Sequence, residues 1–392
     1  MWCFVASFGA YFSMYAFRKP FSAALFEGDD TVMTSKAVFI LSQVVGYMCS
    51  KFIGVKVISE LKQNKRITLI IGLIIFAQLT LLLFALIPVR FKFLFLFLNG
   101  LPLGMIWGIV FSFLEGRRVT EFIASGLCIS AIVSSGFLKT LGRYFIEAYN
   151  VSDYWMPSLV GGLFMPVFIG FVWMLYQIPP PSKDDKSFKK ERVPMNSEGR
   201  RAVIHKYGLG MVLLILSYAM LSIFRDFRDN FSVEIWKQMN PNADLTIYAK
   251  TETIIAVMVV LFMGALSLFR SIKKGVIATY LLMGLGFVLI VIGTLSYENH
   301  IISPFYWMIL SGGGLYLAYV PFQVVIYEKL IAWLDIKGNA GFLMYLSDST
   351  GYLFTVIILI GTKFISWEID WLNFIIQTAY ITGFIGLIKL AF

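Results

Sequence analysis

Residues 179–206 read PPPSKDDKSFKKERVPMNSEGRRAVIHK and form the only long polar segment of this 392-residue chain. Six long apolar runs precede the segment and six follow it. Its eight Lys and Arg residues predict a cytoplasmic location against anionic lipid headgroups. We interpret it as a solvated linker, with docking of a regulatory partner as the alternative. The predicted domains are an N-terminal six-helix bundle (1–178), the cytoplasmic linker (179–206) and a C-terminal six-helix bundle (207–392).

The composition is that of a membrane protein. Apolar side chains make up 58% of the residues and charged ones only 14%, and the mean hydropathy is +0.78. Soluble domains hold roughly 45–50% apolar and ~25% charged residues, so a soluble multidomain enzyme is excluded. Because a bilayer-spanning helix needs ~20 apolar residues, we predict an all-α polytopic membrane protein with twelve transmembrane helices. The predicted spans are 2–25, 36–59, 67–88, 91–114, 121–146, 155–178, 207–236, 249–269, 276–297, 304–327, 340–363 and 371–391.

Charged loop residues predict the topology. The loops that follow even-numbered spans are basic, whereas the opposite loops are acidic. The basic loop residues are Lys56, Lys62, Lys65, Arg66, Arg117, Arg118, Arg270, Lys273, Lys274, Lys329 and Lys337. Because cytoplasmic loops carry the excess of Lys and Arg, we expect a multi-pass protein of the cell (inner) membrane with both termini in the cytoplasm. This distribution explains the net charge of +10 without nucleic acid as a partner.

The two halves of the chain repeat each other. Phe17-Arg18 recurs as Phe224-Arg225. Each half returns to its starting side after six spans, so the repeat is parallel. We predict two six-helix bundles that face each other across a central axis, the architecture of secondary transporters that rock between two states. Repeated glycines such as Gly136 are expected to allow close helix packing.

Ionisable residues inside the predicted spans are candidate functional positions, because charges in a bilayer are costly and usually face a cavity or a partner. They are Arg18, Lys19, Lys51, Lys139, Arg225, Asp226, Arg228, Asp229, Glu252 and Asp348. Arg18 and Lys19 follow roughly sixteen residues of the predicted first helix, a rise of about 24 Å. This rise places both residues past the midplane of the bilayer.

The repeat relates Arg18 to Arg225, so both should approach the central axis from opposite bundles. Two guanidinium groups in a dry cavity repel each other unless an anion lies between them, and their forks match phosphate or carboxylate oxygens. The alternative is local neutralisation of Arg225 by Asp226 or Asp229, for which Arg228 competes. Arg18 has no acidic neighbour in its own helix.

Lys139 and Asp348 lie in the repeat-related fifth and eleventh spans. They are interpreted either as a proton or ion relay, or as a snorkelling lysine and an acid that pairs with a neighbouring helix. The high aromatic content of 17% is interpreted as mostly lipid-facing and packing side chains.

No catalytic constellation is visible in the sequence. The two histidines lie in predicted loops, the three cysteines lie inside apolar runs, and there is no His/Cys cluster or phosphate loop. We therefore expect no enzymatic activity, no metal and no cofactor, and we expect a monomer.

Seven segments carry a family resemblance: YAFRKPF (15–21), SKFIG (50–54), NGLPLGMIWG (99–108), FRDFRDNFS (224–232), TET (251–253), YVP (319–321) and KGNAGFLMYL (337–346). They resemble the major facilitator superfamily, and within it the organophosphate:inorganic phosphate antiporter branch, which takes up glycerol-3-phosphate or hexose phosphates. Ala131 stands where that branch has a histidine, and Asn230 stands where it has an aspartate. Relative to that branch, Lys139 is an additional charged residue, and Asp348 stands where the branch has a glycine.

The resemblance implies specific roles for seven residues. It implies a phosphate clamp of Arg18 and Arg225, a supporting charged network of Lys19, Lys51 and Glu252, and a cavity lining with Tyr319 and Tyr345. The predicted function is secondary active transport of a small anionic solute, a phosphorylated metabolite or phosphate, by alternating access. The solute and the lipid bilayer are the expected partners. The alternatives are a proton-coupled carrier of another organic anion and a transporter-like sensor, and we favour phosphate exchange over proton coupling.

Overall fold

The computed structural model describes residues 2–26, 35–114, 120–179, 197–266, 268–269, 271–327, 330, 340–364 and 370–391. Within these ranges all regular secondary structure is helical. Nine of the described helices are long and apolar enough to cross a membrane. The predicted all-α membrane fold of twelve transmembrane helices in two bundles is confirmed.

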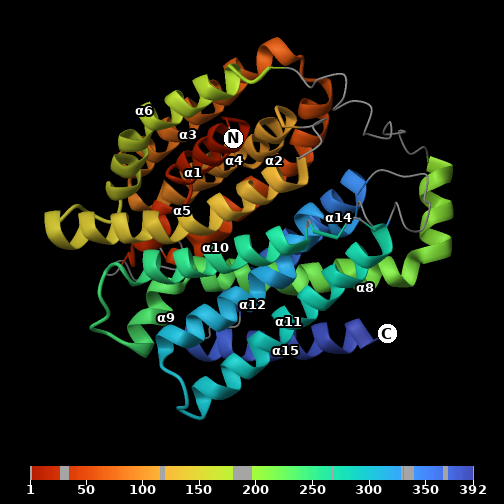
Figure 1. The fold of residues 1–392 in the computed structure, drawn as a ribbon. Helices are drawn as coiled ribbons and strands as arrows, with labels where there is room; N and C mark the ends of the chain where they lie inside the picture. The colour runs from red at the N-terminus through yellow and green to blue at the C-terminus, as the bar shows by residue number, and fades with distance from the viewer. Residues whose placement is uncertain are drawn as a thin grey trace.

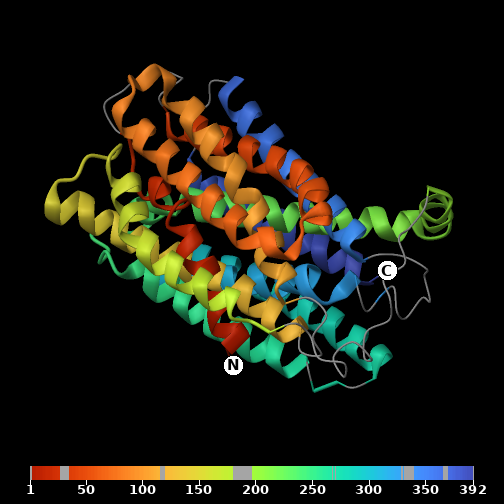
Figure 2. The ribbon, with the colours of Figure 1, turned by 90° about the horizontal axis from the view of Figure 1, so that it is seen from above.

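Six long helices of the N-terminal half pack into one bundle, and six of the C-terminal half pack into another (Figure 1). The first set is α1 (Trp2–Tyr15), α2 (Lys36–Glu60), α3 (Arg66–Leu86), α4 (Lys92–Ser112), α5 (Thr120–Tyr149) and α6 (Met156–Tyr176). The second set is α8 (Ser197–Asn230), α10 (Ile247–Leu266), α11 (Ile272–Glu298), α12 (Pro304–Val324), α14 (Ala340–Phe364) and α15 (Trp371–Ala391). A short helix α9 (Ser232–Met239) follows α8. In the view from above, the helices of the N-terminal half overlie those of the C-terminal half (Figure 2).

Helix contacts repeat between the two halves of the chain. The pairs α1–α5, α1–α6, α2–α4, α3–α4 and α3–α6 of the first bundle correspond to α8–α14, α8–α15, α10–α12, α11–α12 and α11–α15 of the second. The main contacts between the bundles, α5 against α10 and α2 against α14, are exchanged by the same correspondence. A twofold relation between the bundles therefore governs both their interior packing and their interface.

Gly136 permits the close approach of α5 to α10. A Cβ atom at this position would lie 2.7 Å from the Cβ of Glu252, a separation that real side chains do not tolerate. The expectation that glycine serves close packing is confirmed here, at the interface between the two bundles.

The first predicted span, 2–25, is wrong in its second half because α1 ends at Tyr15. The amide nitrogens of Phe17 and Arg18 donate to the carbonyls three residues back, at 3.0 Å each, so the helix tightens into turns. Pro20 then begins the short 3-10 helix η1, which ends at Ala23. Proline has no amide hydrogen, and its ring clashes with the carbonyl four residues back, so an α-helix does not pass through this point.

The C-terminal counterpart of this region behaves differently. Helix α8 begins at Ser197, ten residues before the predicted boundary at 207, and continues unbroken to Asn230. Residues 197–206 of the predicted linker are therefore helical, and no proline follows Pro194 before the end of α8. The division into domains at 179–206 stays a prediction.

Candidate functional site

A cavity lies between the two bundles, with ≈ 710 Å³ of empty space including its open side. Side chains of both halves line it: Tyr11, Tyr15, Arg18, Lys19, Tyr47, Lys51, Trp107, Cys128, Ala131, Arg225, Asp226, Asp229, Tyr316, Tyr319, Val320, Gln323, Asp348 and Tyr352. The lining thus consists mainly of charged and aromatic side chains. Charged groups and ring faces are the kinds of side chain that can contact a polar solute.

Arg18 lies in the turn between α1 and η1 and is 7% exposed. It has no carboxylate partner among the described residues, and its Nε is buried without a hydrogen bond. The guanidinium carbon lies 3.9 Å from the centre of the Tyr47 ring, an arrangement in which the ring face stabilises the cation. Gln43 donates to the carbonyl oxygen of Arg18 at 3.1 Å, which fixes the turn that carries the side chain.

Arg225 is repeat-related to Arg18 but has a carboxylate partner. Its Nε and Nη2 donate to Oδ1 of Asp226 at 3.0 and 2.7 Å, and its Nη1 donates to the hydroxyl of Tyr319. Thr355 donates to the other oxygen of Asp226 at 3.2 Å. The charge of Arg225 is thereby compensated inside the C-terminal bundle.

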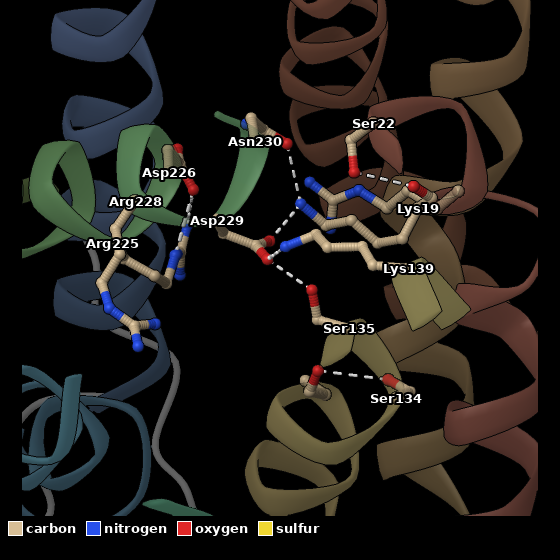
Figure 3. A network of polar contacts seen from close by, with 12 residues as sticks. Lys19, Ser22, Ser134, Ser135, Lys139, Arg225, Asp226, Arg228, Asp229 and Asn230 are labelled. Atoms are coloured by element: carbon tan, nitrogen blue, oxygen red, sulfur yellow. Dashed lines mark hydrogen bonds and ion pairs between the residues drawn. The ribbon is translucent and has the colours of Figure 1, made fainter. Parts of the chain in front are cut away.

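Asp229 joins the two bundles through two lysines, as Figure 3 shows. Lys19 pairs with its Oδ2 and Lys139 with its Oδ1, while Ser135 also donates to Oδ1. Lys19 donates in addition to the side-chain oxygen of Asn230 at 2.9 Å. One carboxylate of α8 therefore pairs with two buried cations of the N-terminal bundle.

A second connection between the bundles runs through Lys51 of α2 and Asp348 of α14, whose charged atoms are 3.0 Å apart. Tyr218 donates to Oδ1 of Asp348 at 2.7 Å, and its hydroxyl lies 2.8 Å from that of Tyr319. Gln323 donates to both tyrosine hydroxyls. A hydrogen-bonded chain therefore links Asp348 to the residue that contacts Arg225.

Three of the predicted network residues lie outside the cavity lining. Arg228 and Glu252 form a buried pair at 2.7 Å, and Arg228 also donates to the carbonyl of Met308 at 3.0 Å. Lys139 reaches Asp229 from behind the lining. The backbone of Tyr345 is part of α14, and its side chain is not among those that the structure describes.

Aromatic residues are the part of the site that sequence reasoning missed. Seven of the lining side chains are Tyr or Trp, of which only Tyr319 was expected there. An aromatic content of 17% hides these residues among many lipid-facing and packing rings. One usable signal exists, since Tyr11 and Tyr218 occupy matching positions seven residues before the two repeated arginines.

The arrangement of helices is that of the major facilitator superfamily. The fold matches the crystal structure of the nucleoside transporter NupG with a TM-score of 0.64 and 11% identity, over 100% of this chain and 98% of that one. It matches the D-xylose-proton symporter with a TM-score of 0.59 and 14% identity, over 100% and 96%. The proton:xylose symporter XylE bound to 6-bromo-6-deoxy-D-glucose gives a TM-score of 0.60 and 14% identity, over 100% and 94%.

The sequence itself belongs to DUF5690, a family of unknown function, whose profile matches residues 20–392. No protein of curated function matches the sequence. At 10–14% identity the structural matches establish the fold. Membership of the major facilitator superfamily, and of its organophosphate branch, stays a prediction.

Proposed function

We propose that this protein is a secondary transporter that carries a small anionic solute across the membrane by alternating access. The observation that carries the proposal is Arg18, a buried cation with no carboxylate partner among the described residues, which faces a cavity between two bundles. A buried unpaired charge costs several kcal/mol. An anion in the cavity would offset this cost and would form charge-assisted hydrogen bonds to the guanidinium group.

The charge balance around the cavity supports a solute with two negative charges. The cavity and the side chains directly behind it hold six cations, which are Arg18, Lys19, Lys51, Lys139, Arg225 and Arg228. They hold four carboxylates, which are Asp226, Asp229, Glu252 and Asp348. These described side chains at the cavity therefore carry a net charge of +2. A phosphate monoester carries about −1.5 to −2 at neutral pH, so a phosphorylated metabolite or phosphate fits this surplus.

The interface between the bundles supports alternating access. Ion pairs of Lys19 and Lys139 with Asp229, and of Lys51 with Asp348, cross from one bundle to the other. Rocking of the bundles would break and reform such pairs, and a solute that offers its own charges would replace part of what is lost. The predicted charged network therefore has a physical role in coupling binding to movement.

Uptake into proteoliposomes tests the proposal. A panel of phosphate esters and sugar acids is first screened by thermal shift of the purified protein, and labelled binders are then offered to loaded vesicles. We expect at least one phosphate ester to bind and to accumulate against internal phosphate. Binding without uptake would instead support a transporter-like sensor, and binding of no anion would overturn the proposal.

A proton-coupled carrier is the second candidate, because Asp348 faces the cavity and holds Tyr218 as a hydrogen-bond partner. If a proton gradient alone accumulates solute in vesicles without internal phosphate, and Asp348→Asn abolishes this, coupling is to protons. We favour exchange, in which the same variant keeps phosphate-driven uptake.

In the proposed topology the protein spans the cell (inner) membrane. Both termini and residues 179–206 lie in the cytoplasm. The support is the excess of Lys and Arg in the corresponding loops. A cysteine introduced at Asn196 should resist an impermeant thiol reagent in intact cells and react after lysis, with the parent protein as the control for native cysteines. Labelling from outside would contradict this topology.

A further inference from the structure

We propose that Lys139 is a reserve counter-ion for Asp229, whose presence allows Lys19 to leave that carboxylate and bind the solute beside Arg18. This inference rests on the proposed function and assigns the anionic group of the solute to the N-terminal wall of the cavity. It makes Lys139 a positioning residue, since it acts through Asp229 and does not line the cavity.

The first step is the arrangement around Asp229. Two lysine ammonium groups approach one carboxylate, Lys19 at Oδ2 and Lys139 at Oδ1. The side chains of Lys19 and Lys139 are only 6% and 3% exposed. One carboxylate compensates one charge, so a surplus positive charge is buried within this cluster and is poorly screened by water.

The second step is the difference between the two lysines. Lys19 lines the cavity and is the chain neighbour of Arg18, whereas Lys139 lies behind the lining on α5. Figure 3 shows both side chains directed at Asp229 from the N-terminal bundle. Lys139 also shares Oδ1 with the hydroxyl of Ser135, a neighbour that holds the carboxylate on the side away from Lys19. Of the two cations, Lys19 is therefore the one that a solute in the cavity can reach.

The third step is the cost of releasing Lys19. With Lys139 in place, Asp229 keeps one full counter-ion and its hydrogen bond from Ser135 after Lys19 departs. The bond from Lys19 to the neutral side chain of Asn230, 2.9 Å long, is the smaller loss. Without Lys139, the same movement would leave a buried carboxylate without a cation, which is strongly unfavourable.

The fourth step is the two-charge balance on the N-terminal wall. Arg18 supplies one uncompensated positive charge, and the Lys19–Asp229–Lys139 cluster supplies the other. The arginines of the C-terminal bundle are already paired, Arg225 with Asp226 and Arg228 with Glu252. The two adjacent residues Arg18 and Lys19 thus offer a fork and an ammonium group to one anionic group.

A double-mutant cycle for anion affinity tests this role. The variants are Lys139→Met, Asp229→Asn and the double variant, and the probes are glycerol-3-phosphate and glucuronate in binding calorimetry of the full-length protein. We expect Lys139→Met to weaken binding of glycerol-3-phosphate at least tenfold. In the Asp229→Asn background the same substitution should change the affinity less than twofold, because Lys19 then has no carboxylate to leave.

A purely electrostatic effect of a nearby positive charge would give a different result. Lys139→Met would then weaken binding by the same factor in both backgrounds, and this outcome would overturn the inference while leaving the proposed function intact. Unchanged affinity in Lys139→Met would overturn it as well. If no anion of the screened panel binds to the wild-type protein, the proposed function fails, and the inference fails with it.

Lys36→Met is the matched control. Lys36 is also a buried lysine, paired with Glu234 across the two bundles at 2.7 Å, but it does not line the cavity or contact Asp229. Its loss should alter the affinity for glycerol-3-phosphate less than twofold. Thermal unfolding of each variant shows whether the fold persists, and the affinities are compared only among variants that unfold cooperatively.

Discussion

The two repeated Phe-Arg positions of this protein have the same place in the sequence repeat and different chemistry in the structure. Arg18 lies in a break after a short helix, against the ring of Tyr47. Arg225 lies within a continuous helix and forms an ion pair with Asp226, the next residue in the chain. One bundle therefore presents a cation to the cavity, and the other presents a neutral pair.

This comparison shows that an internal repeat can keep an arginine in both halves while the local backbone and the partner of its side chain differ. The sequence left open a symmetric clamp in which both arginines hold the anion, with local neutralisation of Arg225 by Asp226 or Asp229 as the alternative. The structure instead favours an asymmetric site, because a carboxylate that touches Arg225 competes with any solute for the same donors. The asymmetry can be tested by substituting first Arg18 and then the Arg225–Asp226 pair.

Removal of the charge at Arg18 should have the largest effect. Arg18→Gln eliminates the uncompensated cation of the cavity, so we expect affinity for glycerol-3-phosphate to fall about 100-fold, or ~2.8 kcal/mol. Binding calorimetry measures the change. The variant should also unfold at a higher temperature than the wild-type protein, because a buried unpaired charge is lost. An affinity within threefold of the wild-type value would refute the assignment of Arg18 as the anion-binding group.

A conservative change at the same position should have an intermediate effect. Arg18→Lys keeps the charge and loses the planar fork, so affinity should fall about tenfold, or ~1.4 kcal/mol. Uptake at saturating solute should be largely retained. Arg90→Lys is the control, since Arg90 is exposed in the short 3-10 helix η4 (Val89–Phe91) between α3 and α4, and the substitution should leave affinity and uptake unchanged. Equal effects at positions 18 and 90 would show that the fork has no role.

Removal of the whole pair in the C-terminal bundle should have the smallest effect. The double variant Arg225→Gln with Asp226→Asn takes away one positive and one negative charge, so the net charge of the cavity is unchanged. We expect the affinity for glycerol-3-phosphate to stay within about threefold of the wild-type value, or ~0.6 kcal/mol. A loss as large as that of Arg18→Gln would restore the symmetric clamp and contradict the asymmetry.

Much of the fold was predictable because its causes are local in sequence. Apolar runs of bilayer length, a polar segment between six and six of them, and repeated glycines and arginines all leave marks in the chain. The break after α1 could also have been anticipated, since Pro20 ends an α-helix by its own covalent structure. The predicted span 2–25 passed over this signal because hydropathy does not register the loss of an amide hydrogen.

The candidate site was predictable in its charged members and not in its aromatic ones. Arg18, Lys19, Lys51, Arg225, Asp226, Asp229 and Asp348 all line the cavity, because an ionisable residue in a membrane has few other places to lie. Tyr47, Trp107 and Tyr352 line it too. A tyrosine or tryptophan is equally stable against lipid, another helix or a solute, so its position in a span says little about which of these it contacts.

The sequence by itself determined the helical membrane fold, the twofold repeat and the identity of the buried charges, because hydrophobicity and charge act on each segment separately. Only the tertiary structure decided how the charges pair. Whether Asp229 takes one lysine or two, and whether Lys51 meets Asp348, depends on contacts of α8 and α14 with helices some 90 to 300 residues away. Coulomb energy falls with distance in space and is indifferent to distance along the chain, so these pairings exist only once the two bundles face each other.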